Sequence, residues 1–136
     1  MRFDIQVHLD VVSINRSKQH REFFHVPLEG WQQVPGFEGL IDELVLADNL
    51  DPETRTGSRT RLARWQPGTL LPEPVKHDYR EEILVLEGDL VVGCGSDGNG
   101  GEVFEAYSFA TRPAEIWHGP FTTRTGCLQF ELDIYE

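Results

Sequence analysis

Short runs in which apolar and polar residues alternate set the tightest limit on how this chain can fold. The clearest run covers residues 3–11, where Phe, Ile, Val and Leu alternate with Asp, Gln and His. A period of two places the apolar side chains on one face of a β-strand. Comparable runs separated by Gly- and Pro-rich turns recur along the chain, and many short strands at even spacing predict a sandwich or a barrel.

The expected strands can be placed by their flanking turn residues. Residues 22–28 form an extended piece broken by Pro27, residues 61–65 return from a reversal at Gly57-Ser58, and residues 81–94 form a strand pair bent at Gly88-Asp89. Further strands are expected at 102–110, 115–121 and 126–135, with a hairpin loop at 93–101. Residues 40–50 suit either a short helix or a strand, and the prolines of 66–75 resist any regular element.

Composition narrows the class of protein. The chain has 136 residues, which is one ordinary domain, and a net charge of -11 argues against nucleic-acid binding, which needs a basic face. Cys94 and Cys127 have no metal-binding spacing and are expected to be reduced and buried. The charged, alternating N-terminus is unlike a signal peptide and no apolar run reaches the length of a membrane span, so we expect a cytoplasmic protein.

Residues 75–85 contain the first candidate site. If they form a strand, Val75, His77, Tyr79, Glu81 and Ile83 share one face. A carboxylate on such an apolar face is costly to bury unless it is paired or bound to a metal. One alternative is that Glu81 is held by an arginine across the sheet, for which there are three candidates: Arg59, Arg61 and Arg64.

The other candidate is a metal site. His118 lies in a segment flanked by Pro113 and Pro120, near the start of a predicted strand. If it meets His77 and Glu81, the three residues supply two imidazoles and one carboxylate. This donor set suits iron(II) with open coordination positions, and it also suits zinc.

These residues resemble the cupin motifs. The first cupin motif has the form H-x-H-x3-E-x6-G, and this chain has Val75, His77, Glu81 and Gly88 at those positions. The second motif has a proline followed by a histidine, as at Pro113 and His118. The segments GWQQVPGFEG, TRLARWQPGTLLP, HDYREEILVLEGDL and TRPAEIWHGPFTTRTGCLQFEL are similar to ChrR-type cupins and to small dioxygenase cupins of the acetylacetone-cleaving type.

The resemblance implies an all-β, single-domain cupin, a jelly-roll-like conical barrel formed by residues 31–136. Residues 1–30 would then be an N-terminal strand extension, within the barrel or at a homodimer interface. The resemblance assigns His77, Glu81 and His118 as ligands of a divalent metal, with iron(II) favoured over zinc, nickel and manganese. Val75 stands where the first motif histidine is expected and cannot ligate an ion, so a site without metal remains an alternative.

Aromatic and basic residues near the motifs are candidates for a substrate pocket. Together with Val75 they are Trp65, Tyr79, Trp117, Phe121 and, for a carboxylate substrate, Arg64 and Arg112. Core packing for the aromatics and surface ion pairs for the arginines are the competing interpretations.

Three functions remain open at this point. The first is a metal-dependent oxygenase-type enzyme acting on a small organic substrate, with His77 and Glu81 as catalytic residues. The second is a non-catalytic sensor or ligand-binding cupin with a degenerate site. The third is a metal-free isomerase or cyclase with Glu81 or His77 as acid and base.

Overall fold

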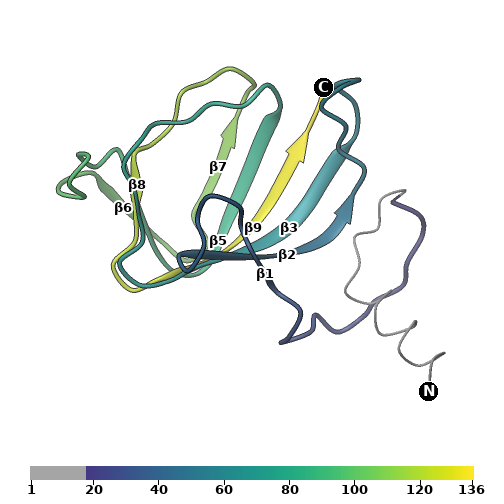
Figure 1. Ribbon diagram of the computed structural model, residues 1–136, viewed down its shortest axis with the longest axis horizontal. Coiled ribbons are helices and arrows are strands. Elements are labelled where there is room, and N and C mark those ends of the chain that lie inside the picture. Colours follow the sequence, from purple (N-terminus) through teal and green to yellow (C-terminus); the bar gives the residue numbers. More distant parts are fainter. Residues whose placement is uncertain (1–17) are drawn as a thin grey trace.

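The structure is a computed structural model that describes residues 18–136, and within them it contains strands and no helix (Figure 1). It follows that the described residues include no helix able to span a membrane. The strand predicted at residues 3–11 lies outside the described residues. The described strands are β1 (Gln32–Gln33), β2 (Ile41–Asp48), β3 (Ser58–Trp65), β4 (Leu70–Leu71), β5 (Arg80–Val92), β6 (Glu102–Glu105), β7 (Phe109–Arg112), β8 (Phe121–Thr122) and β9 (Cys127–Ile134).

The strands form one antiparallel sheet that curls into a partly open barrel. The strand order is β1-β2-β3-β9-β5-β8-β4, and β6 and β7 also pair with β5. Figure 1 shows β6 and β8 facing the part of the sheet that contains β7, β5, β9 and β3. The all-β jelly-roll-like barrel predicted from the sequence is therefore confirmed.

Strand β5 is the longest strand and joins both sides of the barrel. The predicted strand pair at 81–94 is wrong, because the chain runs from Arg80 to Val92 as one strand. A register shift between Val85 and Glu87 bends it, and Gly88 follows with φ +79. A Cβ at Gly88 would lie 1.9 Å from the carbonyl oxygen of Gly126, so only glycine allows this close crossing with the turn before β9.

The bulge also changes which residues face the barrel interior. Before it, Glu81, Ile83 and Val85 are buried and line the interior cavities. After it, Leu90 and Val92 line them. Each part of β5 thus has its own inward-facing alternation.

An apolar cluster forms the core of the barrel. Its buried members are Ile41, Ala63, Trp65, Val85, Leu90, Phe121 and Cys127. The rings of Trp65 and Phe121 meet edge to face with centroids 6.2 Å apart. Full burial of each large side chain stabilises the fold by about 1.5–3 kcal/mol. Both cysteines are free and buried, as predicted.

The structure settles one open sequence assignment, corrects a second and agrees with a third. Residues 40–50 contain strand β2 and no helix. The strand predicted at 102–110 is two strands, β6 and β7. Both run antiparallel to β5, and a turn at Ala106-Tyr107, where φ of Tyr107 is +68, interrupts the pairing between them. Residues 66–75 are irregular as predicted, except for the two-residue strand β4.

Two further predicted strands are largely absent from the described structure. Residues 22–28 contain no strand, and of 115–121 only Phe121 belongs to one, in β8. Within the latter segment, His118 forms an isolated bridge with Val75 instead. Its proline-flanked, irregular backbone brings His118 to the barrel interior without a regular strand.

Strand β9 places its polar side chains inward. Gln129, Glu131 and Asp133 are 1%, 5% and 1% exposed, whereas Phe130 on the opposite face is 37% exposed. Burying such groups is costly unless they are paired, and β3 supplies the partners. Arg59 holds Asp133 at 2.7 Å, and the Nε of Arg61 donates to Glu131 at 2.7 Å.

Candidate metal centre

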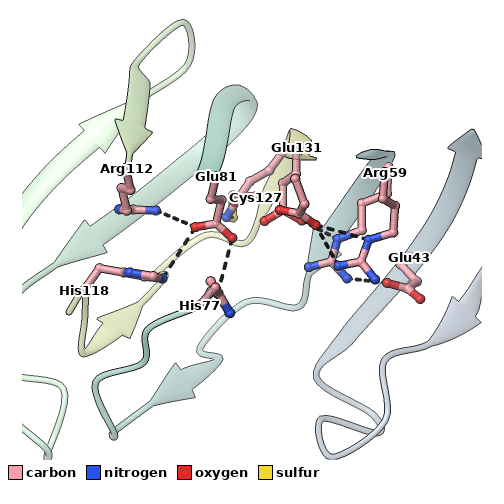
Figure 2. Close-up of polar contacts among 11 residues, drawn as sticks. Glu43, Arg59, His77, Glu81, Arg112, His118, Cys127 and Glu131 are labelled. Atoms are coloured by element: carbon pink, nitrogen blue, oxygen red, sulfur yellow. Dashed lines mark hydrogen bonds and ion pairs between the residues drawn. The ribbon is translucent and has the colours of Figure 1, made fainter. Parts of the chain in front are cut away.

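His77, Glu81 and His118 meet inside the barrel. Their nearest ligand-type atoms all lie within 4.8 Å of one another. The Nε2 atom of His77 is 3.6 Å from Glu81 Oε2, and the Nε2 atom of His118 is 3.5 Å from Glu81 Oε1. Figure 2 shows the two imidazoles approaching the same carboxylate.

Different backbone segments carry Glu81 and His77 to this position. Glu81 is the second residue of β5 and points inward. His77 precedes the strand, and a bend at Asp78-Tyr79 returns its ring over Glu81. The ring of Tyr79 stacks on His77 with centroids 4.7 Å apart. The expectation that His77 lies within the same strand as Glu81 is therefore wrong, although the side chains do converge.

Arg112 holds Glu81 in place. These two residues are paired across β5 and β7, and Arg112 donates to Glu81 Oε1 at 3.0 Å. The alternative partners considered from the sequence are engaged elsewhere: Arg59 and Arg61 bind β9 carboxylates, and Arg64 lies near Asp42. Burial, together with the nearby Asp133, raises the pKa of Glu81, and the Arg112 guanidinium opposes that rise.

His118 presents a lone pair to the carboxylate. Its Nδ1 lies 3.0 Å from the carbonyl oxygen of Ile116, and a carbonyl only accepts, so Nδ1 carries the proton. Burial lowers the pKa of both His118 and His77, which favours their neutral forms. In neutral His118, Nε2 is then an acceptor facing a carboxylate oxygen, and such a pair is stabilised by a cation or a shared proton between the two atoms.

This arrangement fits a divalent metal. Two imidazole nitrogens and one carboxylate form a donor set used for iron(II) and zinc. The backbone carbonyl that orients His118 is the type of outer partner found behind metal-bound histidines. Three protein ligands leave coordination positions open for small molecules.

A cavity of about 140 Å³ lies against the three residues. Of the predicted pocket residues, Val75, Trp65, Phe121 and Arg112 line it. The other three do not belong to this lining. Arg64 stacks on Trp31 at 4.2 Å, Trp117 is 63% exposed with Lys76 over its ring, and Tyr79 lies behind His77.

The polar wall of this cavity was not predicted from the sequence. Arg61, Gln129 and Glu131 line it from β3 and β9. A signal for it exists, since Gln129, Glu131 and Asp133 share one strand parity. That parity is ordinarily assigned to solvent, because the alternate residues Leu128, Phe130 and Leu132 are apolar.

Glu131 should make the folded protein less stable as pH rises. Burial raises its pKa to about 7 from 4.5, against the opposing effect of Arg61. A carboxyl group with a raised pKa binds more protons when folded, so its stabilising contribution is full below the unfolded pKa and is lost as pH rises toward 7. The loss amounts to at most about 3 kcal/mol.

Comparing wild type with Glu131→Gln isolates this effect, because His77 and His118 have lowered pKa values and act in the opposite sense. We expect the free energy of unfolding of Glu131→Gln, relative to wild type, to increase from about pH 5 to about pH 8. Denaturant titrations of metal-free protein at several pH values measure this. Parallel pH profiles for the two proteins would contradict it.

Comparison with known proteins identifies the class by its fold. No family model matches the chain, and no curated protein matches it. Solved structures do match, and several of them are described as cupins. The chain therefore has the cupin fold.

Three matches illustrate the range of proteins with this fold. An RmlC-like cupin from Shewanella frigidimarina has 17% identity and a TM-score of 0.63, covering 88% of this chain and 95% of its own. The polyketide cyclase RemF from Streptomyces resistomycificus has 16% identity and a TM-score of 0.64, covering 87% and 81%. An acetylacetone dioxygenase from Acinetobacter johnsonii has 18% identity and a TM-score of 0.62, covering 90% and 79%.

Proposed function

We propose that this protein is a metal-dependent, oxygenase-type cupin enzyme acting on a small organic substrate. His77, Glu81 and His118 would hold a divalent metal, with iron(II) favoured. The observation that carries the proposal is the Nε2 lone pair of His118, fixed by the Ile116 carbonyl and directed at the Glu81 carboxylate. The acetylacetone dioxygenase and the polyketide cyclase support it as examples of enzymes with this fold.

Residues around the three candidate ligands orient Glu81, exclude water and supply a group that can hold a proton. Arg112 orients Glu81 and favours its ionised form, while Trp65 and Phe121 exclude water from one wall. A bound divalent ion with open positions would supply Lewis-acid activation of a substrate oxygen. Glu131 lines the same cavity, and its pKa of about 7 lets it hold or release a proton near neutral pH.

The test begins with protein purified without chelators. Elemental analysis should find a bound divalent metal. Iron(II)-loaded protein should consume oxygen with a small β-dicarbonyl or phenolic ketone, and manganese, nickel and zinc forms serve as comparisons. A protein that carries no metal and takes up none at micromolar concentration would overturn the proposal.

A non-catalytic ligand-binding or sensor cupin is the second candidate, and two observations favour it. Val75 cannot ligate an ion, and Arg112 already neutralises Glu81 without one. This candidate requires ligand binding without turnover that persists when metal is removed. The same substrate screen, repeated with metal-stripped protein, separates the two functions.

Replacing Val75 with histidine should strengthen metal binding. Val75 and His118 exchange both backbone hydrogen bonds at 2.8 Å, so their side chains leave the bridge on the same face. A histidine at 75 would add an imidazole beside His118. We expect the dissociation constant for zinc or nickel to fall at least about tenfold in Val75→His.

The matched control is Val103→His, at a valine that is 42% exposed on β6. It adds an imidazole away from the site and should leave metal affinity unchanged. Calorimetric titration measures the dissociation constant for zinc or nickel in both variants. Unchanged affinity in a folded Val75→His protein would show that position 75 cannot reach the ion.

A further inference from the structure

A second cavity, of about 160 Å³, lies inside the barrel next to the first. Its walls come from β5, β6 and β7, and they are mainly apolar. The principal wall residues are Ile83, Val85, Leu90, Val92, Phe104 and Ala110. None of the three metal-site residues lines it, so the chemistry proposed above gives this space no role.

The two cavities share walls. Ile83, Leu90 and Arg112 line both of them. Arg112 lies between the two cavities. Its guanidinium reaches Glu81 in the first cavity (Figure 2), and the residue also lines the second. A ligand group in the second cavity would therefore lie directly beside the metal site.

The size and lining of the second cavity indicate what it can hold. Protein interiors contain few voids larger than a water molecule, and an unfilled apolar cavity destabilises the fold. An apolar cavity of about 150 Å³ is large enough to bind benzene. Phe104 and Phe109 line the cavity and are 36% and 60% exposed, so this side of the cavity lies close to the surface.

We propose that the second cavity binds an apolar group of the substrate about the size of a benzene ring, while an adjacent carbonyl lies in the metal-site cavity. The substrate class is thus an aryl or branched-alkyl carbonyl compound. The placement of the carbonyl rests on the proposed function, whereas binding of the apolar group does not.

The first experiment tests the apolar site without metal. Fluorobenzene is titrated into metal-free wild-type protein and followed by fluorine NMR, and we expect saturable binding. Ala110→Leu fills the cavity from β7 and should abolish this binding. Ser108→Leu, on the same wall, is a second filling variant in case the first fails to fold. Ala106→Leu, on the exposed turn, is the matched control and should retain binding.

The second experiment tests the joined site in metal-loaded protein. Benzoylacetone should bind at least about tenfold more tightly than acetylacetone, because it adds a phenyl group that the second cavity can bury. The filling variants should remove this preference and leave acetylacetone binding and metal affinity unchanged.

The outcomes separate the two proposals. No saturable fluorobenzene binding, or equal binding by wild type and both filling variants, overturns the apolar site whatever happens at the metal. If fluorobenzene binds as expected but neither diketone binds metal-loaded protein, the apolar site is supported and the proposed function fails.

Discussion

Glu81→Gln should weaken binding of divalent metal by at least about a hundredfold. Glu81 is the one acidic member of the cluster, and both histidines approach its carboxylate oxygens. Glutamine retains the size of the side chain and an oxygen that accepts from Arg112, but it loses the negative charge that offsets the ion. Oxygen consumption should disappear with the metal, and His118→Ala should have the same effect.

Glu82→Gln is the matched control, because Glu82 is the next residue along β5 and accepts a hydrogen bond from Thr111 outside the cavity lining. Its metal affinity and oxygen consumption should equal those of wild type. Competition with a chromophoric chelator measures the metal affinity of Glu81→Gln, His118→Ala and Glu82→Gln. Metal binding by Glu81→Gln at wild-type strength would exclude this cluster as the metal site.

Arg61→Met should be the most destabilising of the substitutions considered, at about 3–5 kcal/mol near pH 8. Arg61 bridges Glu131 and Glu43, and all three side chains are largely buried. Methionine fills much of the same space but leaves both carboxylates without their cation. At acidic pH the cost should shrink, because Glu131 can then be neutralised by a proton.

The control for this prediction is Arg64→Met on the opposite face of the same strand. The Arg64 side chain is 44% exposed and lies 3.6 Å from Asp42. Exposed pairs of this kind contribute at most about 1 kcal/mol. Urea denaturation gives the free energy of unfolding of both variants. Equal losses for the two would mean that Arg61 is not compensating buried charge.

The meeting of His77, Glu81 and His118 could be predicted because all three residues stand at motif positions. His77 and Glu81 are four residues apart, and the resemblance to the second cupin motif identified His118 as their partner. Arg112 as the partner of Glu81 could not be predicted in the same way. It stands at no motif position and becomes a neighbour only through the register of β5 with β7. Register depends on the whole sheet and not on either strand alone.

Some predicted pocket residues lie outside the cavity lining, because residue type was used without orientation. Trp117 and Arg64 are chemically suited to a ligand site, but the backbone turns both side chains away from the cavity. Glu131 and Gln129 were overlooked for the opposite reason. The strand that carries them presents its apolar residues to the outside, so an interpretation based on hydrophobicity assigns its two faces the wrong way round.

The bulge in β5 changes which alternate side chains point into the barrel. Odd-numbered residues face inward up to Val85, and even-numbered residues do so from Leu90 onward. The spacing of six residues between Glu81 and Gly88 therefore matches a motif and also determines which side chains of β5 face the barrel interior. Inserting or deleting one residue in that interval would turn one of the two parts of β5 outward. If Glu81 stayed inside the barrel, Leu90 and Val92 would face outward, and if Leu90 and Val92 stayed inside, Glu81 would leave the site.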